Sequence, residues 1–493
     1  MKILLKLFSL KLLTSLLGLI YSILQVRYFG VSRLIEIYFA AQTLVYLVTS
    51  LTQSGHLAEV FLPEYHKLEA IKKGLGFKGL NIVINRMFLF GTLILSIVFI
   101  FTPFFIDLIV PGFSDEDKSQ ASLMFRVLIP YLYFQILNSF FITILNAEKK
   151  FGKAEIIGVT NTIINILCLL LLFNYMGVWA LVLSLLLGKI IEFVFYVIQL
   201  NKIGFRFKLI YSMPEFDHNT FFKIMRSTFM YVGATQVYSV VLTASISFLP
   251  VGSLAIFKYV ENLGNRIKSV FLQPFITIFF TTYSSQISNK SSLKALFVRT
   301  LKNLTSVNVI ILSGSLLLGK IIIDFLWGGD KFSQKEVDIA FIFLCFNIVG
   351  VFISSTGTLY RKIVVSEGKS KTLYQYWVFS QLFCAGIIYI LVKHFGINGL
   401  YFAKPINAFL IAVVSYIIYR LGSNYTPLKY LTKRNLYSLL LITISFSLMM
   451  VLNDFEANNM ISDIAFRGGL VLLLSILPLV SIYKTFKENN FKF

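Results

Sequence analysis

The sequence predicts an all-α polytopic membrane protein with two six-helix lobes and two further helices, on four observations. Of its 493 residues, 57% are hydrophobic and only 14% are charged. So few charged residues leave a soluble chain of this length without a polar surface. Apolar runs of about 20 residues, enough to span a bilayer as a helix, recur along the whole chain. Basic residues gather in alternate loops, and two parts of the chain repeat each other.

The apolar runs predict fourteen membrane spans. Each run is long enough for a helix and is bounded by charged or glycine-containing segments. The expected ranges are 7–29, 34–55, 83–108, 121–146, 154–174, 177–200, 225–249, 253–283, 300–327, 337–360, 372–393, 397–420, 434–453 and 464–484.

The loop charges predict the orientation. One set of alternate loops is rich in lysine, as at 67–78, 149–153 and 361–371, whereas the other set is short or acidic, as at 115–117. Basic loops face the cytoplasm. We therefore expect both termini in the cytoplasm. This asymmetry also explains the net charge of +22 better than nucleic-acid binding does.

An internal repeat predicts the domains. "AEKKFGK" at 147–153 is similar to "SEGKSKT" at 366–372, and "YMGVWAL" at 175–181 is similar to "HFGINGL" at 394–400. Both matches have an offset of 219 residues, which corresponds to six helices. We expect lobes at 1–210 and 211–425, followed by two additional helices within 426–493. Parallel repeats with a binding site between halves are common among transporters.

The stretch "FKYVENLGNRIKSVFLQPF" at 257–275 has many polar residues for a membrane span. At 100° per residue its polar side chains fall on one side and its apolar ones lie opposite, which predicts a membrane helix with one polar face. The candidate site residues on that face are Lys258, Glu261, Asn262, Asn265, Arg266 and Lys268.

The second span, 219 residues earlier, shows the same pattern with mostly neutral residues. Its candidate site residues are Gln42, Tyr46 and Thr49, with Glu36 near the edge of the arc, and Arg27 lies at the outer end of the preceding span. Charges at membrane depth cost about 2.5–3.5 kcal/mol each on insertion scales, so they usually face water or a partner. We expect these faces to line a central, water-filled cavity.

The alternative is that Lys258, Glu261 and Arg266 pair with one another to fix packing. Lys404 is open to either interpretation, cavity or packing. Lys189 with Glu192, and Lys320 with Asp324, have the spacing of local pairs near span ends, where they would pair or snorkel.

The sequence contains no phosphate loop, paired-histidine metal motif or nucleophile elbow, so we expect neither an enzyme, a metal site nor a cofactor. The three cysteines lie in apolar runs and are expected to be buried thiols. A basic cavity favours an anionic cargo, such as a phosphate-bearing lipid.

Two segments resemble the MurJ-type lipid II flippases of the multidrug, oligosaccharidyl-lipid and polysaccharide (MOP) exporter superfamily. They are "VRYFGVSRLIEIYFAAQTL" with "SGHLAEVFLPEY" at 54–65, and "IPYLYFQILNSFFITILNAEKKFGKAEIIGVTN" at 129–161. The resemblance implies alternating access by two lobes and a cationic cavity for the headgroup of an undecaprenyl-pyrophosphate-linked glycan. It also implies the bilayer and cell-envelope synthesis enzymes as partners.

The sequence departs from that family at cavity positions. Ser15, Tyr21, Thr49 and Asn262 stand where lipid II flippases have arginines, and Arg266, one turn beyond Asn262, is the alternative source of that charge. Spans 7 and 11 have no acidic residue for a family sodium site. The alternatives are a Wzx-type flippase for O-antigen or exopolysaccharide units, a MATE-like drug exporter, and a non-transporting scaffold.

Overall fold

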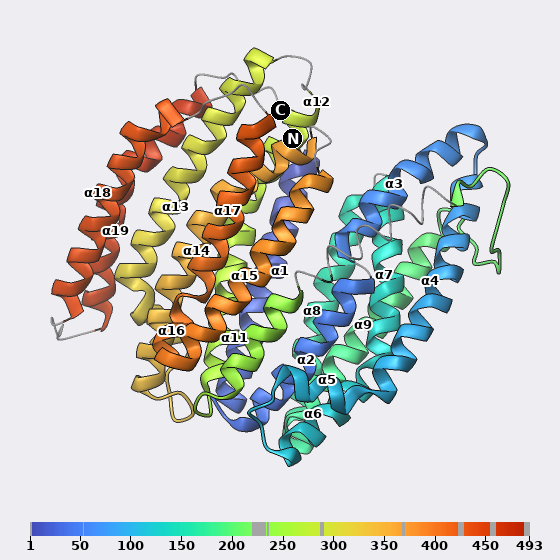
Figure 1. The fold of residues 1–493 in the computed structure, drawn as a ribbon, viewed down its shortest axis with the longest axis horizontal. Coiled ribbons are helices and arrows are strands. Elements are labelled where there is room, and N and C mark those ends of the chain that lie inside the picture. The colour runs from blue at the N-terminus through green and yellow to red at the C-terminus, as the bar shows by residue number, and fades with distance from the viewer. Residues whose placement is uncertain are drawn as a thin grey trace. The chain divides into compact units, whose positions relative to one another are not determined.

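The computed structural model describes residues 2–52, 54–148, 150–218, 233, 236–285, 290–366, 370–422, 428–453 and 460–487. Within these ranges the chain is almost entirely helical, and it divides into two compact units, Met1–Ala255 and Ile256–Phe493. Figure 1 shows the helices of each unit running roughly side by side. The predicted all-α fold is therefore confirmed, while the lobe boundaries given above stay a prediction.

Unit 1 contains the first nine labelled helices. Those nearest its polar sites are α2 (Arg33–Thr52), α4 (Leu75–Ile100), α6 (Asp115–Val127), α8 (Phe151–Met176) and α9 (Trp179–Asn201). The others are α1 (Lys2–Phe29), α3 (Ser54–Ile71), α5 (Thr102–Ile109) and α7 (Ile129–Ala147). Aromatic and aliphatic residues of α3, α4, α7 and α9 form a core cluster of unit 1, so apolar packing holds these helices together.

Unit 2 begins inside α11 (Ser253–Ile267), which continues as the π-helical segment η1 (Lys268–Leu272) and then α12 (Gln273–Ser285). The two longest helices follow, α13 (Lys290–Trp327) and α14 (Gln334–Ser366). The remainder are α15 (Ser370–Phe395), α16 (Ile397–Tyr401), α17 (Ala403–Gly422), α18 (Leu428–Asn453) and α19 (Met460–Lys487). The last two pack against α13, at one side of unit 2 in Figure 1.

The described residues include nine helices long and apolar enough to cross a membrane, or ten if α6 and α7, which meet at a 43° bend, count as one span. Each of the fourteen expected segments contains at least part of a described helix. The segment 225–249 lies partly outside the described residues, and its described part is a helix over Gln236–Ser247. A count of fourteen is consistent with these helices.

The helix boundaries repeat at the predicted offset. Helices α8 (Phe151–Met176) and α15 (Ser370–Phe395) end at positions 219 residues apart. Each is followed by a glycine with positive φ, Gly177 (φ 53°, ψ −127°) and Gly396 (φ 57°, ψ −132°). Side chains rarely adopt that conformation, which explains why glycine occurs at both ends. The two short sequence matches therefore mark the same structural element.

Candidate functional site

The polar segment at 257–275 is helical throughout its length, as predicted. It is made of α11, η1 and the start of α12, and its apolar residues Val260 and Leu263 are buried while Asn265 is exposed. A π-helical turn widens the helix by one residue and is frequent at functional sites. The π-helical turn begins at Lys268, so the polar side chains before and after it do not follow one continuous α-helical period.

The centre of this face is an ion-pair cluster that we call the Glu261 cluster, made of Lys258, Glu261 and Lys404. The Lys404 ammonium donates to the Glu261 carboxylate, and the Lys258 ammonium lies 3.7 Å from its other oxygen. All three side chains are part-buried. Lys404 is the second residue of α17, so the carboxylate joins two helices that are 143 residues apart in sequence.

The cluster carries more positive than negative charge. Lys268, seven residues after Glu261, is repelled electrostatically by Lys404 and by Arg361 of α14. Two lysines share the one Glu261 carboxylate, and an added anion would offset the excess positive charge. Arg361 also stacks over Trp377, with its Cζ atom 5.2 Å from the ring centroid, which restricts where its guanidinium can point.

Small residues bring the backbones of unit 2 close together around the Glu261 cluster. A Cβ atom on Gly264 would lie 2.1 Å from the Asn347 amide oxygen, and one on Gly350 would lie 3.0 Å from the Lys404 backbone carbon. Helix α14 therefore contacts both α11 and α17 at close range. This packing holds the two helices that carry the charged side chains.

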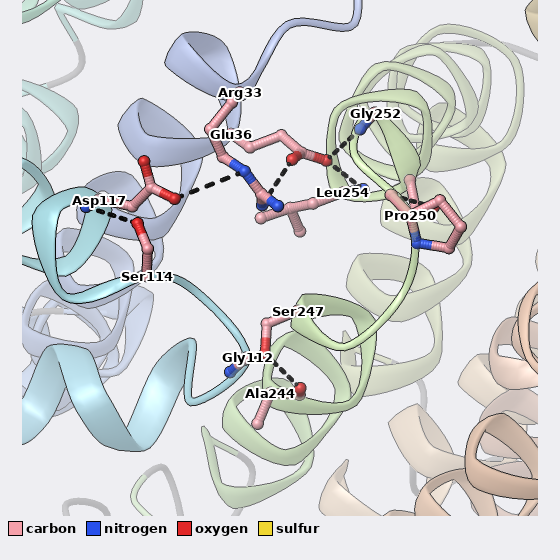
Figure 2. Close-up of polar contacts among 11 residues, drawn as sticks. Arg33, Glu36, Gly112, Ser114, Asp117, Ala244, Ser247, Pro250, Gly252 and Leu254 are labelled. Carbon is pink, nitrogen blue, oxygen red and sulfur yellow. Dashed lines mark hydrogen bonds and ion pairs between the residues drawn. The ribbon is translucent and has the colours of Figure 1, made fainter.

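Unit 1 places a second group of charges at the start of α2, which we call the Glu36 cluster: Arg33, Glu36 and Asp117 (Figure 2). One Glu36 oxygen accepts hydrogen bonds of 2.9 Å from the backbone N–H groups of Gly252 and Leu254. The other oxygen accepts from Arg33 at 2.9 Å, and Arg33 lies 3.6 Å from Asp117.

The Glu36 carboxylate caps the first turn of α11. Backbone N–H groups in a helix's first turn lack helical partners, and a carboxylate there also interacts favourably with the helix dipole. A further hydrogen bond of 2.9 Å, from the Gly112 N–H to the Ser247 hydroxyl, joins the loop before α6 to the segment before α11 (Figure 2). Glu36 is thus a structural anchor at the start of the helix that carries the polar face.

The remaining face of α2 is neutral. Gln42 donates to the Tyr38 hydroxyl at 3.0 Å, and the Tyr21 hydroxyl lies 3.2 Å from that of Ser184. Tyr46 is 53% exposed. Tyr21 is one of the positions where an arginine was expected from the family resemblance, and here it takes part in a hydroxyl network.

The π-helical segment η1 covers the residues that lie 219 positions after 49–53 in the repeat. Thr49, the last candidate residue on α2, corresponds to Lys268, the first residue of η1.

Two local pairs expected from sequence have different outcomes. Lys189 and Glu192 form an ion pair of 2.7 Å, and Glu192 also accepts from Asn161 at 2.9 Å, so the expected pair is confirmed. The prediction that Lys320 pairs with Asp324 is wrong. Lys320 pairs with Asp338 at 2.7 Å, across the turn between α13 and α14, whereas Asp324 accepts from Gln334.

Lys404 and Arg361 are the residues that sequence reasoning left out of the site. Lys404 had one usable signal, since it is an isolated charge at the start of an apolar span, next to Pro405. Arg361 was taken for a loop residue, but α14 continues to Ser366 and keeps it on a helix. Among the described residues, no group of three or more His, Cys, Asp or Glu side chains could hold a metal ion.

The family model described as lipid II flippase MurJ matches residues 25–462 of the chain. The chain belongs to the MurJ lipid II flippase family. One relative, the probable lipid II flippase MurJ of Borreliella burgdorferi (strain ATCC 35210 / DSM 4680 / CIP 102532 / B31), is 21% identical over 401 residues, 79% of this chain and 78% of the relative.

Solved structures show the same fold. A lipid II flippase MurJ in an inward closed conformation has a TM-score of 0.78 at 22% identity and covers 98% of this chain and 99% of its own. An inward-facing multidrug resistance MATE family transporter of the MOP superfamily has a TM-score of 0.65 at 14% identity, covering 85% and 97%. This chain is therefore a MurJ family protein with the fold of the MOP superfamily, as the sequence resemblance implied.

Proposed function

We propose that this MurJ family protein flips lipid II, an undecaprenyl-pyrophosphate-linked peptidoglycan precursor, across the bacterial cytoplasmic membrane by alternating access. The family membership supports the cargo. The observation that carries the site is the pair of lysines, Lys258 and Lys404, that share the single Glu261 carboxylate, with Lys268 and Arg361 adding to the positive charge. A pyrophosphate offers several anionic oxygens, and lysine and arginine bind such groups with charge-assisted hydrogen bonds.

In this proposal Glu261 holds the lysines in place until cargo arrives. Lys404 and Lys258 each have N–H donors beyond those that Glu261 uses, because an ammonium has three. A pyrophosphate oxygen accepts from those donors and reduces the excess positive charge of the cluster. On the same helix, Asn262, Asn265 and Arg266 then contact the glycan headgroup in this proposal. Arg27, Gln42, Tyr46 and Thr49 of unit 1 stay predicted contacts of the cargo.

The charged groups of the Glu36 cluster have a positioning role. By capping α11, Glu36 fixes where that helix begins and hence which way its polar face turns. We infer the orientation from the loop charges, with both termini in the cytoplasm. The proposed cycle makes and breaks no covalent bond. Contacts with cell-envelope synthesis enzymes are a separate proposal.

Complementation tests the cargo. We expect the gene to rescue growth of a strain depleted of its lipid II flippase, and to leave a strain lacking an O-unit flippase unrescued. The neutral residues Tyr21, Thr49 and Asn262 favour one second candidate, a flippase for another undecaprenyl-linked glycan with a less acidic headgroup. Rescue of only the second strain would reject lipid II and support that candidate.

A further inference from the structure

A segment of unit 1 that the flippase proposal does not use runs beside the start of α4. We call residues 205–211, with the sequence FRFKLIY, the strap. It follows α9 and has no helical structure (the green trace next to α4 in Figure 1). Unlike most loops, it is fixed to a helix by a set of side-chain-to-backbone hydrogen bonds.

Two buried asparagines of α4 bind the backbone of the strap. The Asn81 amide donates to the Arg206 carbonyl at 3.0 Å and its oxygen accepts from the Lys208 N–H at 3.0 Å. Asn85 donates to the carbonyls of Lys208 and Ile210, both at 2.9 Å. Asn81 thus pairs with the strap as a neighbouring β-strand would. Arg86, the residue after Asn85, donates from its side chain to the Tyr211 carbonyl at 2.9 Å.

Core contacts fix the segment at both ends. Phe205 and, beyond the strap, Phe216 are buried in the core cluster of unit 1 that α3, α4, α7 and α9 form. The Phe205 ring contacts those of Phe77 and Phe141, with centroids 5.9 Å and 6.3 Å apart. The strap is therefore held in a defined position, and its outward side chains are presented by a fixed backbone.

The side chains that the strap presents alternate between apolar and basic. Phe207, Leu209 and Tyr211 are 60%, 73% and 45% exposed, and Arg206 and Lys208 are exposed between them. Alternate residues of an extended chain point to opposite faces. The strap thus has one apolar face and one basic face, although a water-exposed loop gains nothing from exposing Phe207 and Leu209.

The position along α4 indicates what covers the apolar face. The strap is bound at residues 81–86, and the next turns of α4 expose Phe88, Leu89, Phe90 and Leu93. This α4 helix is long and apolar enough to cross a membrane. Its exposed apolar side chains therefore face lipid. The apolar face of the strap continues that lipid-facing surface at its end, at the level where headgroups lie.

Charge supports the same assignment. Lys202, Lys72, Lys73 and Lys78 are also exposed at this end of unit 1, whereas the nearby exposed acids are Glu148, Glu215 and Asp217. Basic residues beside a membrane surface attract anionic lipids. The flanking charge is thus net positive, and the apolar side chains between the cations match the acyl-chain boundary below the headgroups.

We propose that the strap is an interfacial anchor that binds anionic phospholipid: Phe207, Leu209 and Tyr211 insert at the acyl-chain boundary, while Arg206 and Lys208 bind lipid phosphates. The occupant is the bulk anionic lipid of the membrane, not the flipped cargo. Through Asn81 and Asn85, the anchor fixes unit 1 to one leaflet at the point where the chain leaves α9.

Quenching of tryptophan fluorescence tests the insertion. The full-length protein with Leu209→Trp is reconstituted in bilayers that contain brominated phosphatidylglycerol, and the signal of the unchanged protein is subtracted to remove Trp179, Trp327 and Trp377. We expect quenching at position 209 to exceed that of the Glu215→Trp control. Equal quenching at both positions would overturn the proposal, because Leu209 would then lie outside the bilayer.

Thermal stability tests the charge. We expect phosphatidylglycerol to raise the melting temperature relative to phosphatidylcholine, and Arg206→Gln with Lys208→Gln to remove about half of that rise or more. The matched control removes the same charge at two other exposed lysines, Lys335→Gln with Lys393→Gln. An unchanged rise in the strap variant, or an equal loss in the control, would contradict the proposal. So would quenching that needs added lipid II, which would assign the surface to the cargo.

Discussion

The equivalent helices α2 and α11 both have a polar face, but the face of α2 is largely neutral whereas that of α11 is charged. On α2, Gln42 and Tyr38 form a neutral pair, and the one buried carboxylate, Glu36, lies at the helix start, where backbone N–H groups and Arg33 bind it. On α11, the charges lie in the middle of the helix and are part-buried with an excess of cations. Both copies of the repeat therefore have a polar helix face, and the two faces differ in the charge of their side chains.

The difference separates charges that build the fold from charges that are free to bind a cargo. Glu36 and Glu192 in unit 1 each have their own cation and further hydrogen-bond donors. Glu261 in unit 2 is shared by two lysines, and Lys268 interacts electrostatically with one of them, Lys404, and with Arg361. We infer that the Glu261 cluster of unit 2 supplies the attraction for an anionic headgroup.

The largest effect should come from Lys258→Gln combined with Lys404→Gln. Each removed cation takes away a charge-assisted contact of about 1.5–3 kcal/mol, so we expect transport to fall by about a hundredfold or more. Growth of a strain depleted of its lipid II flippase, with membrane-inserted protein quantified in parallel, measures this. Lys335→Gln with Lys393→Gln is the control. Equal falls in inserted protein and transport would assign the cluster to packing.

Removing the cap of α11 should have the next largest effect. Glu36→Ala leaves Arg33 without its buried carboxylate and two backbone N–H groups without an acceptor, at a cost of about 3–5 kcal/mol. We expect a lower melting temperature of the purified protein. Glu36→Gln keeps one acceptor and should lose less. Identical melting temperatures for all three proteins would contradict the anchoring role.

Lys189→Met tests whether a charge of unit 1 stabilises the fold without binding the cargo. It leaves the Glu192 carboxylate in the core of unit 1 with Asn161 as a remaining donor, and we expect a loss of about 2–3 kcal/mol in stability. Transport per folded molecule should stay unchanged. A fall in that ratio, measured in vesicles with matched amounts of folded protein, would place Lys189 itself in the cargo site and contradict its packing role.

Tyr46→Phe should have the smallest effect. It removes one hydroxyl from an exposed position on the neutral face, where a hydrogen bond to a sugar contributes about 0.5–1.5 kcal/mol. We expect transport to fall by about two- to tenfold at most. Complementation under limited expression is sensitive enough to detect this. A loss as large as that from the lysine pair would remove the distinction between the two faces.

Much of the fold was predictable from the sequence because its signals are local. Apolar runs locate the helices, and the 3.6-residue period of 257–275 identifies a helix with a polar face. Gly177 and Gly396 mark the repeat because only glycine readily adopts their backbone conformation. The π-helical turn at Lys268 had no such signal, since side-chain periodicity does not distinguish it from a continuous α-helix.

Pairings across long sequence distances could not be predicted. Lys404 reaches Glu261 only because α14 brings α11 and α17 together at Gly264 and Gly350. Lys320 was assigned to Asp324 by spacing, yet the turn after α13 brings Asp338 closer. The strap was also missed. Its short alternation resembles a β-strand, and its actual partners are side-chain amides of Asn81 and Asn85.

Lipid II binding by the purified protein tests most directly whether the Glu261 cluster binds the cargo. The dissociation constant is measured for the unchanged protein, for Lys258→Gln with Lys404→Gln, and for Lys335→Gln with Lys393→Gln, all in neutral-lipid nanodiscs. The account predicts that the first pair weakens binding by about tenfold or more, whereas the second pair leaves it within about twofold. Equal affinity of all three proteins, with intact melting transitions, would contradict it.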